Sequence, residues 1–194
     1  MKKWLCWILC AALLLGALPL AAGAENTPWY EGYARYAGEN GLMKGRAADD
    51  FAGEGTLTRA EFATVLYRLA GEPPVSEEES PFADAPDGKW YSSPVVWAYH
   101  AKVVTGYPDG TFRPQEPITR EAIAAMTVRW LTYEKVYLTA VADPVTGQTQ
   151  TAFSAEEYGD RESISSWAAE AVGEVSRLGL MTGSEGAGGR VFRP

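Results

Sequence analysis

The stretch that decides the fold is Gly106-Tyr107-Pro108-Asp109-Gly110-Thr111-Phe112-Arg113-Pro114, which is followed by Thr119-Arg120-Glu121-Ala122. The same arrangement occurs 61 residues earlier, where Thr58-Arg59 corresponds to Thr119-Arg120. The offset also relates three further pairs of residues: Trp29 and Trp90, Gly45 and Gly106, and Phe51 and Phe112. The chain is therefore built from a repeated unit, and a unit of about 50 residues buries little core without its neighbours.

A third copy of the repeat begins at Trp167. This tryptophan lies 16 residues before Gly183, just as Trp90 lies 16 residues before Gly106. The copy runs to Phe192-Arg193-Pro194, and a third Thr-Arg element would come next. We therefore expect two complete repeats and a third that is truncated before its second helix.

Each Thr-Arg element predicts the start of a helix. Thr58 is expected to be an N-cap that forms a capping box with Glu61. Apolar residues follow at helical spacing: Phe62, Val65, Leu66 and Leu69. Thr119 is the corresponding N-cap, but Ala122 stands in place of the glutamate, so the second box is lost. The first helix of copy one is expected to start at Thr27-Pro28-Trp29 and to end at Asn40-Gly41, that of copy two follows Trp90-Tyr91, and that of copy three starts at Ser165-Ser166-Trp167. The predicted fold class is therefore mainly α: tandem helix-loop-helix repeats with short β-leaning segments only in loops.

The N-terminus has the form of a secretory signal. Met1-Lys2-Lys3 precedes an apolar stretch over residues 4–15, and Ala22-Gly23-Ala24 offers small residues for cleavage. An uncleaved anchor is the alternative, because residues 4–24 carry no charge. The expected organisation is a signal peptide at 1–24, repeat one at 25–73, an acidic linker at 74–80, repeat two at 81–134, a loop or hairpin insert at 135–152 and the truncated repeat three at 153–194.

Composition excludes several classes of site. Cys6 and Cys10 lie in the leader and His100 is the only histidine, so a disulfide framework, cysteine or multi-histidine zinc sites and the usual catalytic triads are excluded. The formal net charge of −8 argues against nucleic acid and anionic membrane surfaces as partners. We expect no metal, no cofactor, membrane contact only through the signal peptide, and a local site for any anionic ligand.

These motifs resemble the S-layer homology repeat, which usually occurs three in a row. The resemblance rests on Phe82-x-Asp84, Trp97-Ala98, the stretch at 106–114 and Ile118-Thr119-Arg120-Glu121, and it covers nearly all of the chain after the leader. It implies a pseudo-threefold array of helix-loop-helix units that anchors exported proteins non-covalently to the cell envelope, at the wall or S-layer surface.

The resemblance also implies a ligand. The family usually binds a secondary cell-wall polysaccharide that carries a pyruvate ketal, and the arginine of its Thr-Arg-Ala-Glu motif reads the ketal carboxylate in grooves between neighbouring repeats. By position these arginines are Arg59 and Arg120. Copy two departs from the motif with Thr-Arg-Glu-Ala, and copy three supplies no arginine at this place.

A physical argument supports the same residues. An arginine at the first turn of a helix faces the positive end of the dipole, so helix stability does not explain its recurrence. A carboxylate there would meet free backbone N–H groups and a bidentate guanidinium together. The predicted glycan-binding site comprises the arginines, their caps, the tryptophans as stacking platforms and the loop glycines: Arg59, Arg120, Thr58, Thr119, Trp29, Trp90, Gly45 and Gly106.

Other interpretations of these residues stay open. The arginines can instead pair with acidic residues of an adjacent repeat, as charged residues usually do. Tryptophans in small repeats fill the core more often than they face a ligand. Asp84 and Asp109 are interpreted as turn or cap formers in preference to calcium ligands.

Two other functions compete with non-catalytic anchoring. Peptidoglycan modified with polyamines, in a diderm envelope, would suit the acidic surface, whereas Arg59 and Arg120 favour an anionic ligand. A cell-wall glycan hydrolase is disfavoured, because the carboxylates lie in linkers, caps and turns. Possible partners are a C-terminal cargo domain beyond Pro194 or another S-layer homology protein.

Overall fold

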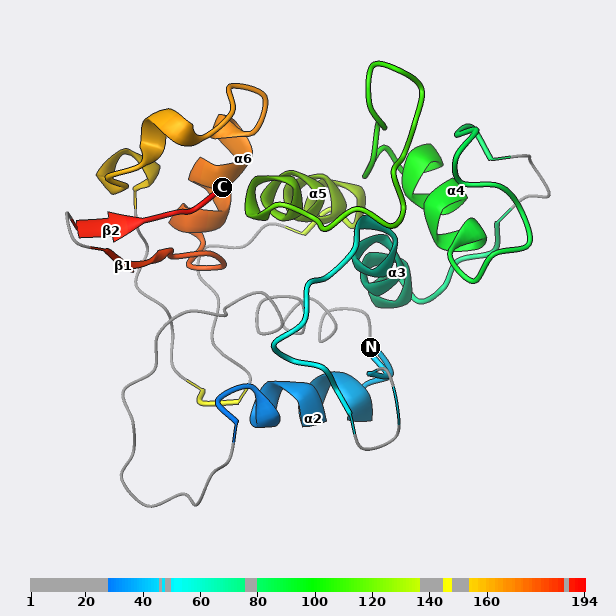
Figure 1. Ribbon diagram of the computed structural model, residues 1–194, viewed down its shortest axis with the longest axis horizontal. Coiled ribbons are helices and arrows are strands. Elements are labelled where there is room, and N and C mark those ends of the chain that lie inside the picture. The colour runs from blue at the N-terminus through cyan, green and yellow to red at the C-terminus, as the bar shows by residue number, and fades with distance from the viewer. Residues whose placement is uncertain are drawn as a thin grey trace. The chain divides into compact units, whose positions relative to one another are not determined.

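The computed structural model describes residues 28–45, 47, 50–75, 80–136, 145–147, 154–186 and 189–194 (Figure 1). Its α-helices are α2 (Glu31–Glu39), α3 (Arg59–Leu69), α4 (Ser92–His100), α5 (Arg120–Tyr133) and α6 (Ala169–Arg177). Two short 3-10 helices, η2 (Ala155–Glu157) and η3 (Arg161–Ser163), precede α6. Strands β1 (Ser184–Gly186) and β2 (Gly189–Val191) form one antiparallel hairpin. The prediction of a mainly α fold with short strands in loops is confirmed.

The chain divides into two compact units that do not follow the sequence repeats. One unit is Gly55–Tyr137, and the other combines Met1–Glu54 with Leu138–Pro194. Helix α3, the second helix of copy one, thus folds with α4 and α5 of copy two. The pseudo-threefold array and the repeat boundaries stay predictions. The expected signal peptide and most of the insert at 135–152 lie outside the described residues.

In the Gly55–Tyr137 unit, α3 packs mainly against α4 and also contacts α5. The capping box of Thr58 and Glu61 is present, and it starts α3 as predicted. Thr119 caps α5 by accepting the amide of Ala122 at 3.2 Å, without a box, also as predicted. The largest fully buried side chains of this unit come from all three helices and from the segment between α4 and α5: Phe62, Leu66, Val95, Val103, Phe112 and Trp130. Each contributes about 1.5–3 kcal/mol by its burial.

The loops of all three copies have the same backbone conformation at their two ends. The glycines that open the loops, Gly45, Gly106 and Gly183, have φ angles of 68, 71 and 70°. The residue after the loop phenylalanine also has a left-handed backbone conformation in each copy: Ala52, Arg113 and Arg193 have φ angles of 53, 59 and 56°. The three loops therefore begin and end with the same backbone conformation, and the loop of copy three also contains the β1–β2 hairpin.

An aspartate fastens the loop in copies two and three. The Asp84 carboxylate accepts the backbone N–H groups of Phe112 and Arg113, at 2.8 and 2.7 Å. Asp160 does the same in copy three, where it accepts the N–H groups of Phe192 and Arg193 at 2.7 Å each. Asp84 is therefore a structural residue. Asp160 has the same role in copy three, which was not predicted from the sequence.

The first helices of copies one and three begin later than expected. Helices α2, α4 and α6 start two residues after the repeat tryptophan, because Trp29, Trp90 and Trp167 lie in the preceding turn. Helix α2 ends at Asn40-Gly41 as predicted. Among the described residues, none of the helices combines the length and the apolar character needed to cross a bilayer.

Candidate anion-binding site at the start of α3

The loop of copy two pairs with the first turn of α3. Backbone N–H groups of Arg59 and Ala60 donate to the carbonyl oxygens of Glu116 and Pro114, both at 3.0 Å. Just before the helix, the N–H of Ile118 donates to Leu57 O at 2.8 Å. The expectation of free N–H groups at this helix start is therefore wrong. The first amides of a helix lack intrahelical partners, and the neighbouring loop supplies them.

The Arg59 side chain is held against the same loop. Its Nε donates to the carbonyl oxygen of Phe112 at 2.8 Å. Its Cζ lies 4.8 Å from the centre of the Tyr107 ring and 5.0 Å from that of Phe112. The residue is only 9% exposed. The structure therefore brings together a predicted site residue and two aromatic residues that the prediction did not include.

The outer nitrogens of Arg59 are the open part of this arrangement. Within the described part of the chain, neither Nη1 nor Nη2 makes a hydrogen bond or an ion pair. Neither belongs to the fully enclosed side-chain atoms that lack a partner, so both reach the surface. The alternative that Arg59 forms an ion pair with an acidic residue of the adjacent repeat finds no support among the described residues.

The electrostatics of Arg59 follow from its burial. Desolvation lowers the pKa of the guanidinium, and the opposing influences are Tyr107, then Glu116 and Asp84. A guanidinium stays protonated at any working pH, so Arg59 is a nearly buried cation. Such a charge is costly unless it is paired. A bound carboxylate would offset this cost.

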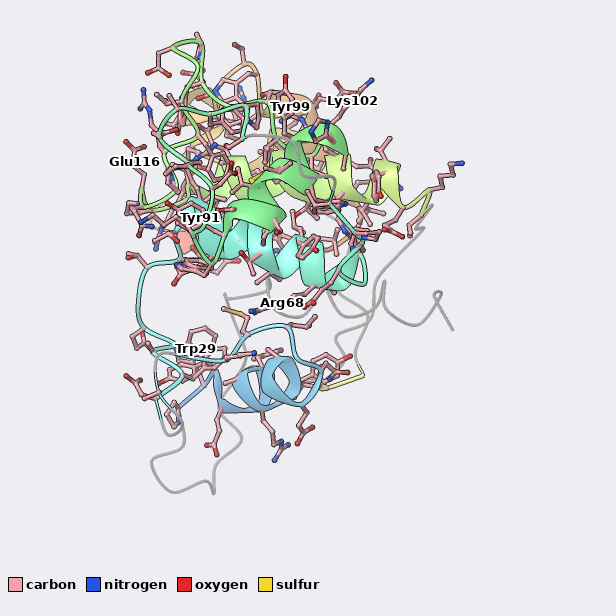
Figure 2. All side chains as sticks on the ribbon, turned by 90° about the vertical axis from the view of Figure 1, so that its right-hand side faces the viewer. Trp29, Arg68, Tyr91, Tyr99, Lys102 and Glu116 are labelled. Atoms are coloured by element: carbon pink, nitrogen blue, oxygen red, sulfur yellow. The ribbon has the colours of Figure 1, made fainter. Side chains whose placement is uncertain are left out.

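A second arginine stabilises the loop beside Arg59. Arg113 stacks on Tyr107 with its Cζ 3.9 Å from the ring centre, and its Nη2 lies 2.9 Å from Asp109 Oδ2. Its Nη1 lies 3.7 Å from Glu116, which Figure 2 labels. Asp109 also accepts the hydroxyl of Thr111 at 2.6 Å. Thr111 and then Arg113 hold the pKa of Asp109 at about 2, so this carboxylate is a turn former, as expected.

The second predicted arginine lies at the start of a different helix. Arg120 is half-buried in the first turn of α5, and its N-cap Thr119 is exposed. The structure thus places Arg59 and Arg120 at two separate helix starts. A repeat signal existed for Phe112, which recurs as Phe51 and Phe192, but Tyr107 is specific to copy two and could not be found in this way.

The predicted glycines have a clear backbone role. A Cβ on Gly45 would lie 2.6 Å from the Asp50 carbonyl oxygen, and one on Gly106 would lie 2.9 Å from that of Thr111. Both residues also have positive φ. They shape their loops, and a direct part in ligand binding stays a prediction.

The predicted tryptophans are on the surface. Trp29 is 51% and Trp90 58% exposed, and Trp167 is 57% exposed at the same place in copy three. The alternative that Trp29 and Trp90 fill the core is therefore wrong; next to Trp90, the buried side chain is Tyr91, which packs edge-on against the indole. The Trp29 indole N–H donates to Glu54 Oε1 at 2.9 Å. Within the described residues, no cluster of three His, Cys, Asp or Glu residues could hold a metal ion.

Comparison with known proteins gives the family. Residues 24–63 and 81–124 match the model of the S-layer homology domain. The chain is 33% identical over 160 residues to an endoglucanase of Bacillus sp. (strain KSM-635), covering 82% of this chain and 16% of that protein. It is 31% identical over 144 residues to a surface layer protein of Brevibacillus choshinensis, covering 69% of this chain and 13% of that protein.

A further relative is the cellulosome-anchoring protein of Acetivibrio thermocellus, with 33% identity over 93 residues, 46% of this chain and 21% of that protein. The chain thus spans about a fifth or less of the length of each of these relatives. Its matched domains and surface-layer relatives indicate a location at the cell surface, in association with the wall. Through its two matched repeats, this chain belongs to the S-layer homology family.

Proposed function

We propose that the chain is a non-catalytic module that anchors to the cell wall by binding an acidic secondary cell-wall polysaccharide. Arg59 reads a carboxylate of that polymer, such as the carboxylate of a pyruvate ketal. The observation that carries the proposal is the nearly buried guanidinium of Arg59, which has two outward nitrogens and no ion pair among the described residues. The S-layer homology family supports the anchoring role.

The geometry suits a carboxylate in particular. Nε of Arg59 is occupied by the Phe112 carbonyl, which leaves Nη1 and Nη2 as the donors for a ligand. Two parallel N–H groups match the two oxygens of a carboxylate, and such paired, charge-assisted hydrogen bonds are strong. A local cation also explains how a chain of net charge −8 binds an anionic polymer.

The remaining predicted residues take supporting parts in this proposal. Arg120 binds a second carboxylate at the start of α5, and Thr58 and Thr119 stabilise the two helix starts as N-caps. Trp29 and Trp90 offer exposed indole faces on which a pyranose ring can stack.

Sedimentation with purified walls tests the proposal. We expect Arg59→Ala to reduce binding at least tenfold, and Arg59→Lys to bind weakly because it keeps the charge and loses the bidentate fork. Arg68→Ala, which removes a half-buried arginine from the other end of α3, is the matched control and should bind normally. Thermal melts of each variant separate lost binding from lost folding.

The same assay on walls stripped of ketal pyruvate tests the ligand. Wild-type protein should lose most of its binding to stripped walls. Unchanged binding to the stripped walls would refute the proposal that Arg59 binds the ketal carboxylate. It would favour a ligand without that group, such as polyamine-modified peptidoglycan. Zymography on walls tests the absence of catalysis, since any clearing by the purified protein would contradict a binding-only module.

A further inference from the structure

We propose that Tyr107, together with the rest of its loop, positions the guanidinium of Arg59 for its carboxylate ligand. The inference rests on the proposed function and deepens it. Tyr107 comes from copy two, whereas Arg59 comes from copy one, so a residue of the next repeat determines how well this arginine binds.

The loop of copy two constrains the guanidinium of Arg59 in three ways. The rings of Tyr107 and Phe112 lie 4.8 and 5.0 Å from its Cζ, and the Phe112 carbonyl takes its Nε proton. An arginine side chain normally loses much of its rotamer entropy when it is fixed by a ligand. In Arg59 the side chain is already fixed by its loop contacts before a ligand binds. Binding therefore costs less rotamer entropy, because the guanidinium is preorganised.

Tyr107 is itself held in place. Its backbone N–H donates to Thr111 O at 2.8 Å, and its carbonyl accepts the N–H of Gly110 at 2.9 Å. The guanidinium of Arg113 covers the ring at 3.9 Å and is anchored by Asp109. The ring is thus the fixed element between two arginines, of which Arg113 already has acidic partners.

The tyrosine that contacts Arg59 is not repeated in the other two copies. The residue after the loop glycine is Arg46 in copy one, Tyr107 in copy two and Ser184 in copy three. The chain therefore supplies a single tyrosine at this loop position, and Arg59 uses it. Because this contact exists before the ligand binds, it changes affinity by preorganising the guanidinium, and we expect an effect of about five- to thirtyfold, whose upper end corresponds to the full rotamer entropy of an arginine.

Calorimetry with purified pyruvylated wall polysaccharide, using the full chain, tests the inference. Tyr107→Leu should weaken binding by about five- to thirtyfold, whereas Tyr107→Phe, which keeps the ring, should stay within about threefold of wild type. Tyr99→Leu is the matched control, because Tyr99 is a partly exposed tyrosine of the same unit that packs on Phe82. Arg59→Ala should weaken binding at least tenfold.

The outcomes separate this inference from the proposed function. Equal binding by Tyr107→Leu and Tyr99→Leu, with Arg59→Ala defective, would overturn the role of Tyr107 and leave the carboxylate site standing. Normal binding by Arg59→Ala would refute the proposed function itself. The Tyr107→Leu defect must also vanish on polysaccharide stripped of pyruvate, since an equal loss on both polymers would indicate structural damage instead.

Discussion

Replacing Gly106 by alanine is expected to destabilise the Gly55–Tyr137 unit far more than the same change four residues later. Gly106 opens the loop that pairs with α3, and its φ angle is +71°. A Cβ there would overlap Cε1 of the Phe82 ring and lie 2.9 Å from the carbonyl oxygen of Thr111. Gly110 has a similar φ of +80°, but a Cβ there meets nothing within 4 Å.

The pair of glycines separates backbone strain from steric overlap. A left-handed alanine costs about 1–2 kcal/mol, and the loss of glycine freedom in the unfolded chain returns about 0.4–1 kcal/mol. Gly110→Ala should therefore cost about 1 kcal/mol. Overpacking adds about 1–3 kcal/mol at Gly106, because Phe82 is buried and the Thr111 oxygen is backbone. Gly106→Ala should cost about 2–4 kcal/mol.

Urea unfolding of the full chain, followed by tryptophan fluorescence, measures the difference. Trp97 and Trp130 are buried in this unit, so their emission reports its unfolding. With a denaturant slope of about 1–3 kcal/mol per M, the midpoint for Gly106→Ala should fall by about 1 M or more. Equal midpoints for the two alanine variants would refute the reasoning, since they share the backbone conformation and differ only in the overlap.

Three further predictions follow from the loop and the helix starts. Asp84→Ala should destabilise the unit by about 3 kcal/mol or more in urea melts, because two loop amides lose a charged acceptor. Thr58→Ala should cost about 1 kcal/mol and more than Thr119→Ala, since only Thr58 belongs to a capping box; equal costs would contradict this. The folded pKa of Asp109, about 2, is below its unfolded value of about 3.9, so its stabilising contribution is complete above that unfolded value and is lost as the pH falls through about 2. Carboxyl NMR titration should show this midpoint, and Thr111→Val should raise it; no change would contradict the role of the Thr111 hydroxyl.

The local features of this protein were readable from the chain. Helix α3 begins at the predicted cap because Thr58, Glu61 and the apolar stripe are all within one or two turns of each other. The loop turns were likewise predictable, since glycine and aspartate act on their immediate neighbours. The predicted starts of α2 and α6 were too early. A cap-like residue before an aromatic residue marks the turn that precedes the helix as well as the helix itself, and the sequence does not distinguish the two.

The non-local features required the structure. The sequence predicted the fold class, the repeat, the helix caps and Arg59 as a candidate carboxylate-binding residue, because each depends on spacing within a short segment. Only the tertiary structure decided that the amides of α3 are already paired, that the tryptophans are exposed and that Tyr107 and Phe112 enclose Arg59. The hydrogen bond from Arg59 to Phe112 joins residues 53 positions apart. No local pattern encodes which loop meets which helix, because that choice depends on how the apolar faces of successive repeats pack.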